Sequence, residues 1–331
     1  MKSRRRNRDD DDDDIDLGED ERGPQRFLYD KLATATDDFN EDRKLGAGGF
    51  GGVYRGFLKD MGLEVAIKKV SDTSKQGKKE YLSEVKIISQ LRHRHLVQLI
   101  GYCRRNTRFL LVYELVRNGS LDSYLFGSRG CLPWTVRHKI ALGLASALLY
   151  LHEEWTRCVL HRDVKASNVM LDENFEAKLG DFGLARLVDH DQNLQTTDVA
   201  GTMGYLAPEC YYTRKASKES DVYSFGVVAL EIACGRKVID FTAVEERSDL
   251  VRWVWELHGL GRVREAADER LGGEFDEGEI ERLMVVGLWC AHPNYASRPS
   301  MRQAIGVLCS DAELPELPYE MPVPFAVPPP I

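Results

Sequence analysis

The sequence lacks the signatures of a disulfide-stabilised, zinc-binding or membrane-spanning protein. Its seven cysteines are scattered, odd in number and without any Cys-x-x-Cys pair, which favours free thiols in a reducing compartment. No stretch reaches the roughly 18 apolar residues that cross a bilayer. The most apolar one, residues 140–151, contains Ser146 and predicts a buried helix. The N-terminus does not have the pattern of a signal peptide, so we expect the chain itself to be soluble.

The charged residues do not form a nucleic-acid face. The net charge is −8 over 331 residues, and no stripe of lysine and arginine interleaves with aromatics. Charge is segregated only at the N-terminus, where a basic cluster at residues 2–8 precedes an acidic run at 9–14. Such blocks predict a disordered tail. The basic cluster also fits the cytoplasmic flank of a membrane helix, with a nuclear address as the weaker alternative.

The sequence does contain a glycine-rich stretch in a context suited to phosphate binding. Gly46-Ala47-Gly48-Gly49-Phe50-Gly51-Gly52-Val53 lies between two expected strands, residues 43–45 and 53–56. Backbone N–H groups approach bulky phosphates closely only where no side chain intervenes, and glycine allows the required dihedral angles at little cost. A dinucleotide-binding loop would run from a strand to a helix instead. A glycine-rich hairpin turn is the alternative.

A lysine follows at the end of an apolar strand. The run before Lys68 predicts a strand that is buried on both faces. A buried lysine is costly unless it is paired, and its available partners are nucleotide phosphates or a carboxylate of the helix expected over residues 78–91. Glu84 lies in the middle of that helix and Glu80 one turn earlier. Lys69 points to the other face of the strand, so Lys68 is preferred.

Three side chains with oxygen atoms are closely spaced later in the chain. Asn168 lies five residues, and Asp181 eighteen residues, after Asp163. Residues 169–171 and 177–179 predict a hairpin that holds the oxygens of Asn168 and Asp181 on one side. Carboxylate and amide oxygens are hard ligands that suit Mg²⁺. Ordinary turn residues are the alternative, but the spacing disfavours it.

These motifs together carry a family resemblance. The glycine stretch, Val65-Ala66-Ile67-Lys68, His161-Arg162-Asp163-Val164-Lys165-Ala166-Ser167-Asn168 and Asp181-Phe182-Gly183 form the signature set of protein kinases. The chain resembles a eukaryotic-type protein kinase over roughly residues 39–308. The resemblance implies an α+β fold of two lobes: a small antiparallel β lobe with one main helix, about residues 39–112, and a larger, mostly helical lobe, about residues 119–308. It also implies ATP in the cleft, with Mg²⁺ bridging its phosphates.

The resemblance assigns roles in the nucleotide site. It pairs Lys68 with Glu84, makes Tyr113 the gatekeeper, and places the backbone of Glu114 and Val116 at the adenine edge. Adenine would lie between Val53, Ala66 and Met170. The implied nucleotide-binding residues are Leu45, Gly46, Ala47, Gly48, Gly49, Phe50, Gly51, Gly52, Val53, Ala66, Lys68, Glu84, Glu114, Val116 and Met170.

In the catalytic loop, the resemblance makes Asp163 the base that accepts the proton of the substrate hydroxyl. Lys165 would neutralise charge on the transferring phosphoryl group, and Asn168 and Asp181 would bind Mg²⁺. A lysine at position 165 is typical of serine/threonine kinases, so Ser and Thr of protein substrates are the implied acceptors. Some transfer to tyrosine stays open.

The segment after Asp181 suggests a switch. We expect the charge of Arg162, next to the base, to attract an anion, and a phosphothreonine would supply about 1.5–2 negative charges. Thr197 is the first candidate and Thr196 the second, whereas we expect Thr202 to bond the catalytic aspartate and lysine. By resemblance, Glu209 pairs with Arg298, and Asp221 holds the backbone of the catalytic loop.

Stretches outside the motifs narrow the resemblance. Residues 23–39 resemble the entry segment of plant receptor-like kinases. Together with Lys75-Gln76-Gly77-Lys78-Lys79-Glu80-Tyr81, His152-Glu153-Glu154-Trp155, Gln195-Thr196-Thr197, Trp289-Cys290-Ala291-His292-Pro293 and Met321-Pro322-Val323-Pro324, they resemble the kinase domain of L-type lectin-domain receptor kinases. In that family a lectin ectodomain and one membrane helix precede a basic and then acidic stretch. We therefore expect a disordered tail (1–26), a lead-in segment (27–38), a kinase domain (39–308) and a proline-rich tail (309–331). The location is the cytoplasmic side of the plasma membrane if the chain belongs to a receptor, and the cytoplasm if it is complete.

Several alternatives remain at this stage. A pseudokinase scaffold would lack a motif residue, and none is missing; a sensing receptor would need an upstream ectodomain. Expected partners are protein substrates and a second copy for trans-autophosphorylation, with membrane contact only through a transmembrane segment absent from this chain. The proline-rich tail predicts extended packing on the large lobe or disorder, with partner docking as the sharper alternative. His93 and His95 predict packing or surface roles rather than a metal site.

Overall fold

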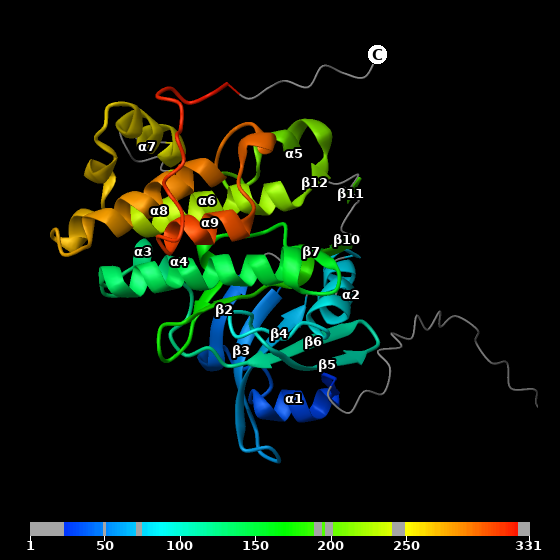
Figure 1. Ribbon diagram of the computed structural model, residues 1–331. Coiled ribbons are helices and arrows are strands. Elements are labelled where there is room, and N and C mark those ends of the chain that lie inside the picture. The colour runs from blue at the N-terminus through cyan, green and yellow to red at the C-terminus, as the bar shows by residue number, and fades with distance from the viewer. Residues whose placement is uncertain are drawn as a thin grey trace, which may run out of the picture.

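The computed structural model describes residues 23–48, 51–70, 75–188, 194–195, 201–239 and 249–323. The chain forms two lobes, a smaller one built on a sheet and a larger one built mostly of helices (Figure 1). The α+β, two-lobed architecture implied by the motifs is thereby confirmed.

Six strands form the sheet of the small lobe, in the order β1-β5-β6-β4-β3-β2. They are β1 (Gln25–Arg26), β2 (Lys44–Gly48), β3 (Gly51–Leu58), β4 (Leu63–Val70), β5 (Leu99–Arg105) and β6 (Arg108–Glu114). Neighbours are antiparallel except β1, which is parallel to β5. Side chains alternate between the faces of a strand, so Val65 and Ile67 are buried on the outer face, while Lys68 faces helix α2 (Lys75–Ile88).

The lead-in segment covers the outer face of this sheet. Helix α1 (Tyr29–Ala35) lies on the side of the strands that faces away from the large lobe (Figure 1). Phe27, Leu32 and Phe39 are buried there together with Tyr54, Leu58, Val65, Ile67, Cys103, Leu110 and Val112. The small lobe therefore includes residues well before position 39, and the lead-in segment contributes part of its core.

The prediction of a disordered tail over residues 1–26 is wrong at its end, because Gln25 and Arg26 form β1. A two-residue strand carries no periodic sequence signal. Its pairing also depends on Gly101 of β5, where a Cβ atom would lie 2.2 Å from the carbonyl oxygen of Gln25. The rest of that predicted tail, residues 1–22, lies outside the described residues.

The large lobe is organised around a buried central helix, α6. Every residue of α6 from Ser220 to Cys234 is buried, as expected of a helix that other elements enclose. Ser217 caps its start in a capping box with Ser220, and Gly235 ends it in a left-handed conformation. The helices of this lobe are α3 (Asp122–Leu125), α4 (Trp134–Leu149), α5 (Pro208–Thr213), α6 (Lys218–Cys234), α7 (Leu250–Gly259), α8 (Glu277–Cys290) and α9 (Met301–Leu308).

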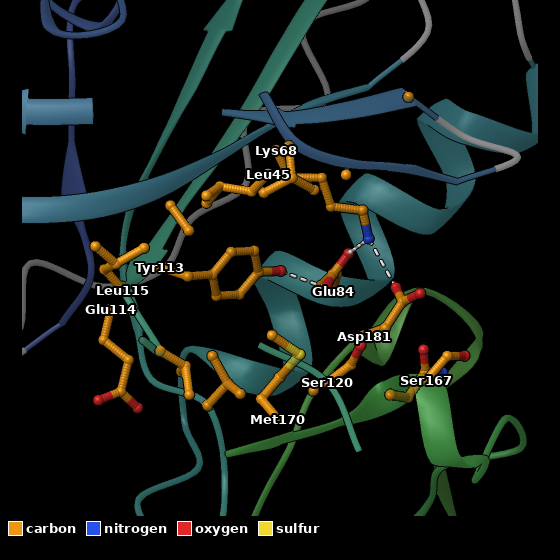
Figure 2. A pocket seen from close by; sticks show the side chains of 18 of the residues that line it. Leu45, Lys68, Glu84, Tyr113, Glu114, Leu115, Ser120, Ser167, Met170 and Asp181 are labelled. Atoms are coloured by element: carbon orange, nitrogen blue, oxygen red, sulfur yellow. Dashed lines mark hydrogen bonds and ion pairs between the residues drawn. The ribbon is translucent and has the colours of Figure 1, made fainter. Parts of the chain in front are cut away.

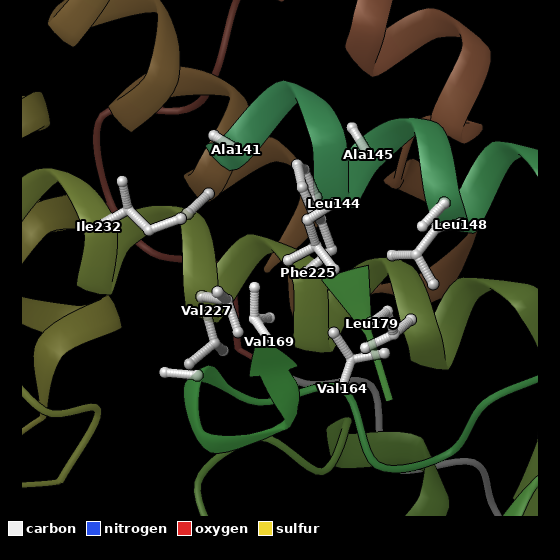
Figure 3. Packing of buried hydrophobic residues seen from close by; sticks show 14 of the residues in the cluster. Ala141, Leu144, Ala145, Leu148, Val164, Val169, Leu179, Phe225, Val227 and Ile232 are labelled. Carbon is white, nitrogen blue, oxygen red and sulfur yellow. The ribbon is translucent and has the colours of Figure 1, made fainter. Parts of the chain in front are cut away.

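Three pairs of short antiparallel strands flank the loops in the described part of the large lobe. They are β7 (Cys158–Leu160) with β10 (Arg186–Val188), β8 (Val169–Leu171) with β9 (Ala177–Leu179), and β11 (Leu194–Gln195) with β12 (Lys215–Ala216). The predicted hairpin at 169–179 is thus present. Figure 3 shows Leu148 of α4 and Phe225 of α6 packing around Val164, Val169 and Leu179, all of which are buried. This core holds the catalytic loop against α4 and α6.

The described part of the C-terminal tail packs on the large lobe. Trp255 Nε1 of α7 donates to the carbonyl oxygen of Pro318 at 3.0 Å, and Leu317 and Met321 pack against the main core. Gly259 permits this approach, because a Cβ atom there would lie 2.2 Å from the Tyr319 carbonyl oxygen. The predicted packing on the large lobe is therefore present at residues 317–321, and residues 324–331 lie outside the described range.

No helix within the described ranges has the length and apolar content needed to cross a membrane. The two histidines that follow α2 have packing roles. His93 stacks on Tyr150, with ring centroids 4.8 Å apart and planes inclined by 15°. His95 Nδ1 lies 2.8 Å from the carbonyl oxygen of Ala177. Among the described residues no group of three or more His, Cys, Asp or Glu side chains is arranged to hold a metal ion.

These histidines predict a pH-dependent stability. Burial lowers the pKa of His93 to about 4 and also lowers that of His95. The unfolded chain therefore binds protons that the folded protein does not, and stability should fall as the pH drops below about 6.5. His93→Phe keeps the stacking on Tyr150 but removes the titrating group. As the pH drops, the free energy of unfolding should therefore fall more slowly in this variant than in the wild type, by up to about 1.4 kcal/mol per pH unit. Urea titrations across this range measure both slopes, and equal slopes would contradict the assignment.

Candidate active site

A cavity of about 460 Å³ lies between the two lobes. Its upper wall comes from β2, β3 and β4, its back from α2 and β6, and its floor from the catalytic loop and β8 (Figure 2). The residues that line it are Leu45, Gly46, Ala47, Gly51, Val53, Ala66, Lys68, Glu84, Val97, Tyr113, Glu114, Leu115, Val116, Ser120, Asp163, Lys165, Ser167, Asn168, Met170, Gly180 and Asp181.

Lys68 lies between two carboxylates. Its Nζ is 3.0 Å from Glu84 Oε2 and 2.7 Å from Asp181 Oδ1 (Figure 2). Burial alone would lower the pKa of Lys68, but the two carboxylates outweigh burial and raise it. The predicted pair with Glu84 is therefore present. The rival Glu80 is bonded instead to Gln76, at 2.9 Å.

Glu84 is held from three sides. Besides Lys68, it accepts a short hydrogen bond from the hydroxyl of Tyr113 and a 3.2 Å bond from the backbone N–H of Phe182. Burial and the neighbouring Glu84 charge raise the pKa of Tyr113 well above its ordinary value, so the hydroxyl stays protonated and donates. Phe182 is buried and packs edge-on against His161, with centroids 4.8 Å apart. The residue after Asp181 is thus fixed to both α2 and the catalytic loop.

Asp163 is the centre of the polar network on the floor. Its carboxylate accepts from Lys165 Nζ at 2.7 Å and from Thr202 Oγ1 at 2.7 Å. Lys165 also donates to Thr202 Oγ1 at 2.9 Å. Asn168 Nδ2 donates to the backbone oxygen of Asp163 at 2.9 Å and to its carboxylate at 3.1 Å. The contacts predicted for Thr202 are therefore present.

The backbone of the catalytic loop is held by Asp221 of α6. The N–H groups of His161 and Arg162 each donate to its carboxylate at 2.8 Å. Burial alone would raise the pKa of Asp221, but these bonds and His152, at 3.0 Å, hold it below its ordinary value. Arg162 has a φ of 71°, an uncommon left-handed conformation for a residue with a side chain. Asp221 stabilises this turn, which places Asp163 at the cavity.

The donor set on one side of the cavity fits a magnesium ion. The amide nitrogen of Asn168 is turned to Asp163, so the amide oxygen is the group left for a cation. Burial would raise the pKa of Asp181, but the ammonium of Lys68 holds it below its ordinary value, so the carboxylate is ionised. Two hard oxygens with room for phosphate oxygens and water match the preference of Mg²⁺.

Most of the predicted nucleotide-site residues line the cavity. Gly48 and Gly52 do not, while Gly49 and Phe50 lie outside the described residues. Glu114 lines it with its side chain bonded to Lys178 at 3.0 Å and to the N–H of Gln98 at 2.9 Å. Ser167 lies in the predicted catalytic-loop motif and Leu115 between the predicted adenine-edge residues Glu114 and Val116, but the sequence interpretation gave neither a role. It did not name the lining residues Val97, Ser120 and Gly180, which only their spacing from the motifs could have indicated.

The segment after Asp181 is fixed at its far end by a buried ion pair. Arg298 donates to both oxygens of Glu209, at 2.6 and 2.8 Å, and its side chain is fully buried. The predicted pair is therefore present, in the bidentate form that holds a segment most firmly. Arg162 donates to the carbonyl oxygen of Leu184 at 3.3 Å. Thr196 and Thr197, the candidates for phosphorylation, lie outside the described residues.

This geometry agrees with the comparisons to known proteins. Residues 39–306 match the protein kinase domain family, and the chain belongs to that family. Within it, the sequence is similar to those of plant L-type lectin-domain containing receptor kinases.

Two relatives come from Arabidopsis thaliana. One is the L-type lectin-domain containing receptor kinase IX.1, 61% identical over 304 residues, which cover 91% of this chain and 47% of the relative. The other is receptor kinase IX.2, 54% identical over 335 residues, or 97% of this chain and 50% of the relative. The receptor kinase SIT2 of Oryza sativa subsp. japonica is 51% identical over 296 residues, or 89% and 44%. The chain spans about half the length of these relatives.

Proposed function

We propose that this chain is an ATP- and Mg²⁺-dependent protein serine/threonine kinase of the receptor-like type. The observation that carries the proposal is the convergence on one cavity of Lys68, bound to Glu84 and Asp181, and Asp163, bound to Lys165 and Asn168. A charged lysine beside an ionised aspartate suits the phosphates and their metal, and a carboxylate on the floor suits an acceptor hydroxyl. A scaffold without activity would not need both the Lys68 group and the Asp163 group.

Each residue then has a definable role in transfer. Lys68 positions the nucleotide phosphates while Glu84 and Tyr113 fix its orientation. Bound at Asn168 and Asp181, Mg²⁺ would screen the phosphate charge. Asp163 orients the acceptor hydroxyl and takes its proton, and Lys165 stabilises the charge of the transferring group. The backbone of Glu114 and Val116 would contact the adenine edge.

Lys165 supports serine and threonine as acceptors. Its ammonium bonds both Asp163 and Thr202, and so ties the base to the segment that receives the substrate. The relatives are named receptor kinases. By analogy we place this kinase domain on the cytoplasmic side of the plasma membrane, with self-association allowing one copy to phosphorylate another.

Phosphorylation of Thr197, or of Thr196 next to it, is the proposed switch. Arg162 precedes the base and is largely buried. A phosphate near it would add charge-assisted hydrogen bonds and fix the segment between Asp181 and Glu209. Thr202 is excluded from this role, because its hydroxyl is bonded to the catalytic pair.

The proposal is tested by incubating the purified chain with labelled ATP and Mg²⁺ and mapping the phosphorylated residues. We expect phosphoserine and phosphothreonine, including Thr196 or Thr197, and near-complete loss of transfer when EDTA removes the metal. Phosphotyrosine alone, or transfer that persists in EDTA, would contradict it. Full activity without phosphate between residues 189 and 200 would refute the switch while leaving the kinase assignment intact.

A further inference from the structure

Ser83 of α2 forms a pair of hydrogen bonds to a distant part of the chain. Its hydroxyl donates to the carbonyl oxygen of Ala185 at 2.8 Å and accepts from Arg186 Nη1 at 2.9 Å. Arg186 Nη1 also donates to the Ala185 oxygen, at 2.7 Å. The three groups close a small, partly buried ring of hydrogen bonds. Ser83 immediately precedes Glu84, but its side chain does not line the cavity.

The partners of Ser83 belong to a segment that the large lobe holds in place. Arg186 begins β10, which pairs with β7 in the register Arg186 to Leu160. The strand β7 ends one residue before His161, where the catalytic loop begins. The Ser83 hydroxyl therefore joins α2, the helix that carries Glu84, to β10, which is paired with the strand that leads into the catalytic loop.

Two further contacts lie along the same interface. The N–H of Phe182 donates to Glu84 Oε1 at 3.2 Å. An added Cβ atom at Gly183 would lie 3.4 Å from Cβ of Glu80, an ordinary van der Waals distance, so this part of α2 lies directly against residue 183. The helix thus contacts residues 182–186 from Glu80 to Glu84. The polar contacts at its two edges are Glu84 to Phe182 and Ser83 to Ala185.

We propose that Ser83 is a positioning residue for phosphoryl transfer. Its hydroxyl fastens α2 to the segment after Asp181, and so keeps Glu84 beside Lys68 while Asp181 faces the cavity. The inference rests on the proposed kinase function. Without the hydroxyl, the helix spends more time displaced, and the fraction of competent molecules falls. Because Ser83 does not line the cavity, turnover should fall while the KM for ATP changes little.

The test compares Ser83→Thr with Ser83→Val, together with Ser83→Ala. Threonine and valine have the same shape and the same β-branched cost in a helix, but only threonine keeps the hydroxyl. We expect Ser83→Ala and Ser83→Val to lower kcat about tenfold, the effect of one or two lost hydrogen bonds. Ser83→Thr should stay within about twofold of the wild type. The control is Ser89→Ala, because within the described parts of the chain the hydroxyl of Ser89 bonds only the Lys86 carbonyl of its own turn.

Hydrogen exchange tests the positioning role independently of kinase activity. Amide hydrogen exchange along residues 80–88 should be faster in Ser83→Ala and Ser83→Val than in the wild type or Ser89→Ala, whether or not the protein is active. A double-mutant cycle of Ser83→Ala with Arg186→Met should be non-additive, since the two residues share one bond. Wild-type kcat and unchanged exchange in Ser83→Ala would overturn the positioning role. An inactive wild type with faster exchange in the variants would instead refute the kinase function alone.

Discussion

Asp163→Asn is expected to reduce phosphoryl transfer by about three orders of magnitude, within the range attributed to a positioned general base. Asparagine has nearly the same shape as aspartate, so the loop should keep its conformation. Its amide, however, cannot accept the proton of the acceptor hydroxyl, and it removes the negative charge that Lys165 and Thr202 now contact. The loss should therefore lie in kcat.

Binding of a fluorescent ATP analogue separates chemistry from folding in this variant. Glu84 and Asp181 are each bonded to Lys68, and this group does not depend on Asp163, so nucleotide affinity should stay within a few-fold of the wild type. Asp60→Asn is a matched control, because among the described residues Asp60 makes only a surface pair with Lys31. Transfer by Asp163→Asn within tenfold of the wild type would show that Asp163 is not the base and would make its role purely structural.

The sequence predicted the chemistry of the site because that chemistry is local. Asp163, Asn168 and Asp181 lie within one loop and one hairpin, whose short strands 169–171 and 177–179 fix the geometry almost independently of the rest of the chain. The choice of Lys68 over Lys69 follows in the same way from the alternation of a strand: Lys69 turns outward, its Nζ 4.8 Å from the ring centroid of Phe39.

The features that sequence could not supply depend on distant partners. Nothing near Ser83 marks it as different from any polar residue of an exposed helix face, because its partners lie about a hundred positions later. The sequence gives no sign that position 101 requires glycine, because the requirement comes from the close approach of the Gln25 carbonyl oxygen. The strand formed by Gln25 and Arg26 is likewise too short to show an alternation of apolar and polar residues. Such contacts arise only from tertiary packing.

Two adjacent apolar residues of the lead-in segment differ in burial, so they test whether this segment packs on the sheet. Phe27 is 4% exposed and Leu28 is 78% exposed. Phe27→Ala should lower the free energy of unfolding by about 3 kcal/mol, the usual cost of emptying a buried aromatic site. Leu28→Ala should change it by less than about 0.5 kcal/mol. Urea denaturation of both variants measures the difference, and equal stabilities would mean that the segment does not pack on the sheet in solution.

Replacing Phe27 should also lower activity, because a series of contacts connects it to the active site. The Phe27 ring packs against β5 at Gly101, where an added Cβ atom would lie 2.4 Å from its Cε2. Alanine keeps the backbone N–H that donates to the carbonyl oxygen of Tyr102 at 2.8 Å, but it removes the ring that presses the segment onto this strand. The next residue of that strand, Cys103, accepts at its carbonyl oxygen from the hydroxyl of Tyr81, at 3.2 Å. Tyr81 lies on α2, nearly one turn before Glu84. A loosened β5 therefore removes support from the helix that positions Lys68, and we expect Phe27→Ala to lower kcat about threefold at a temperature where it remains folded, as for the loss of part of one hydrogen bond. Turnover equal to that of Leu28→Ala would confine the lead-in segment to stability.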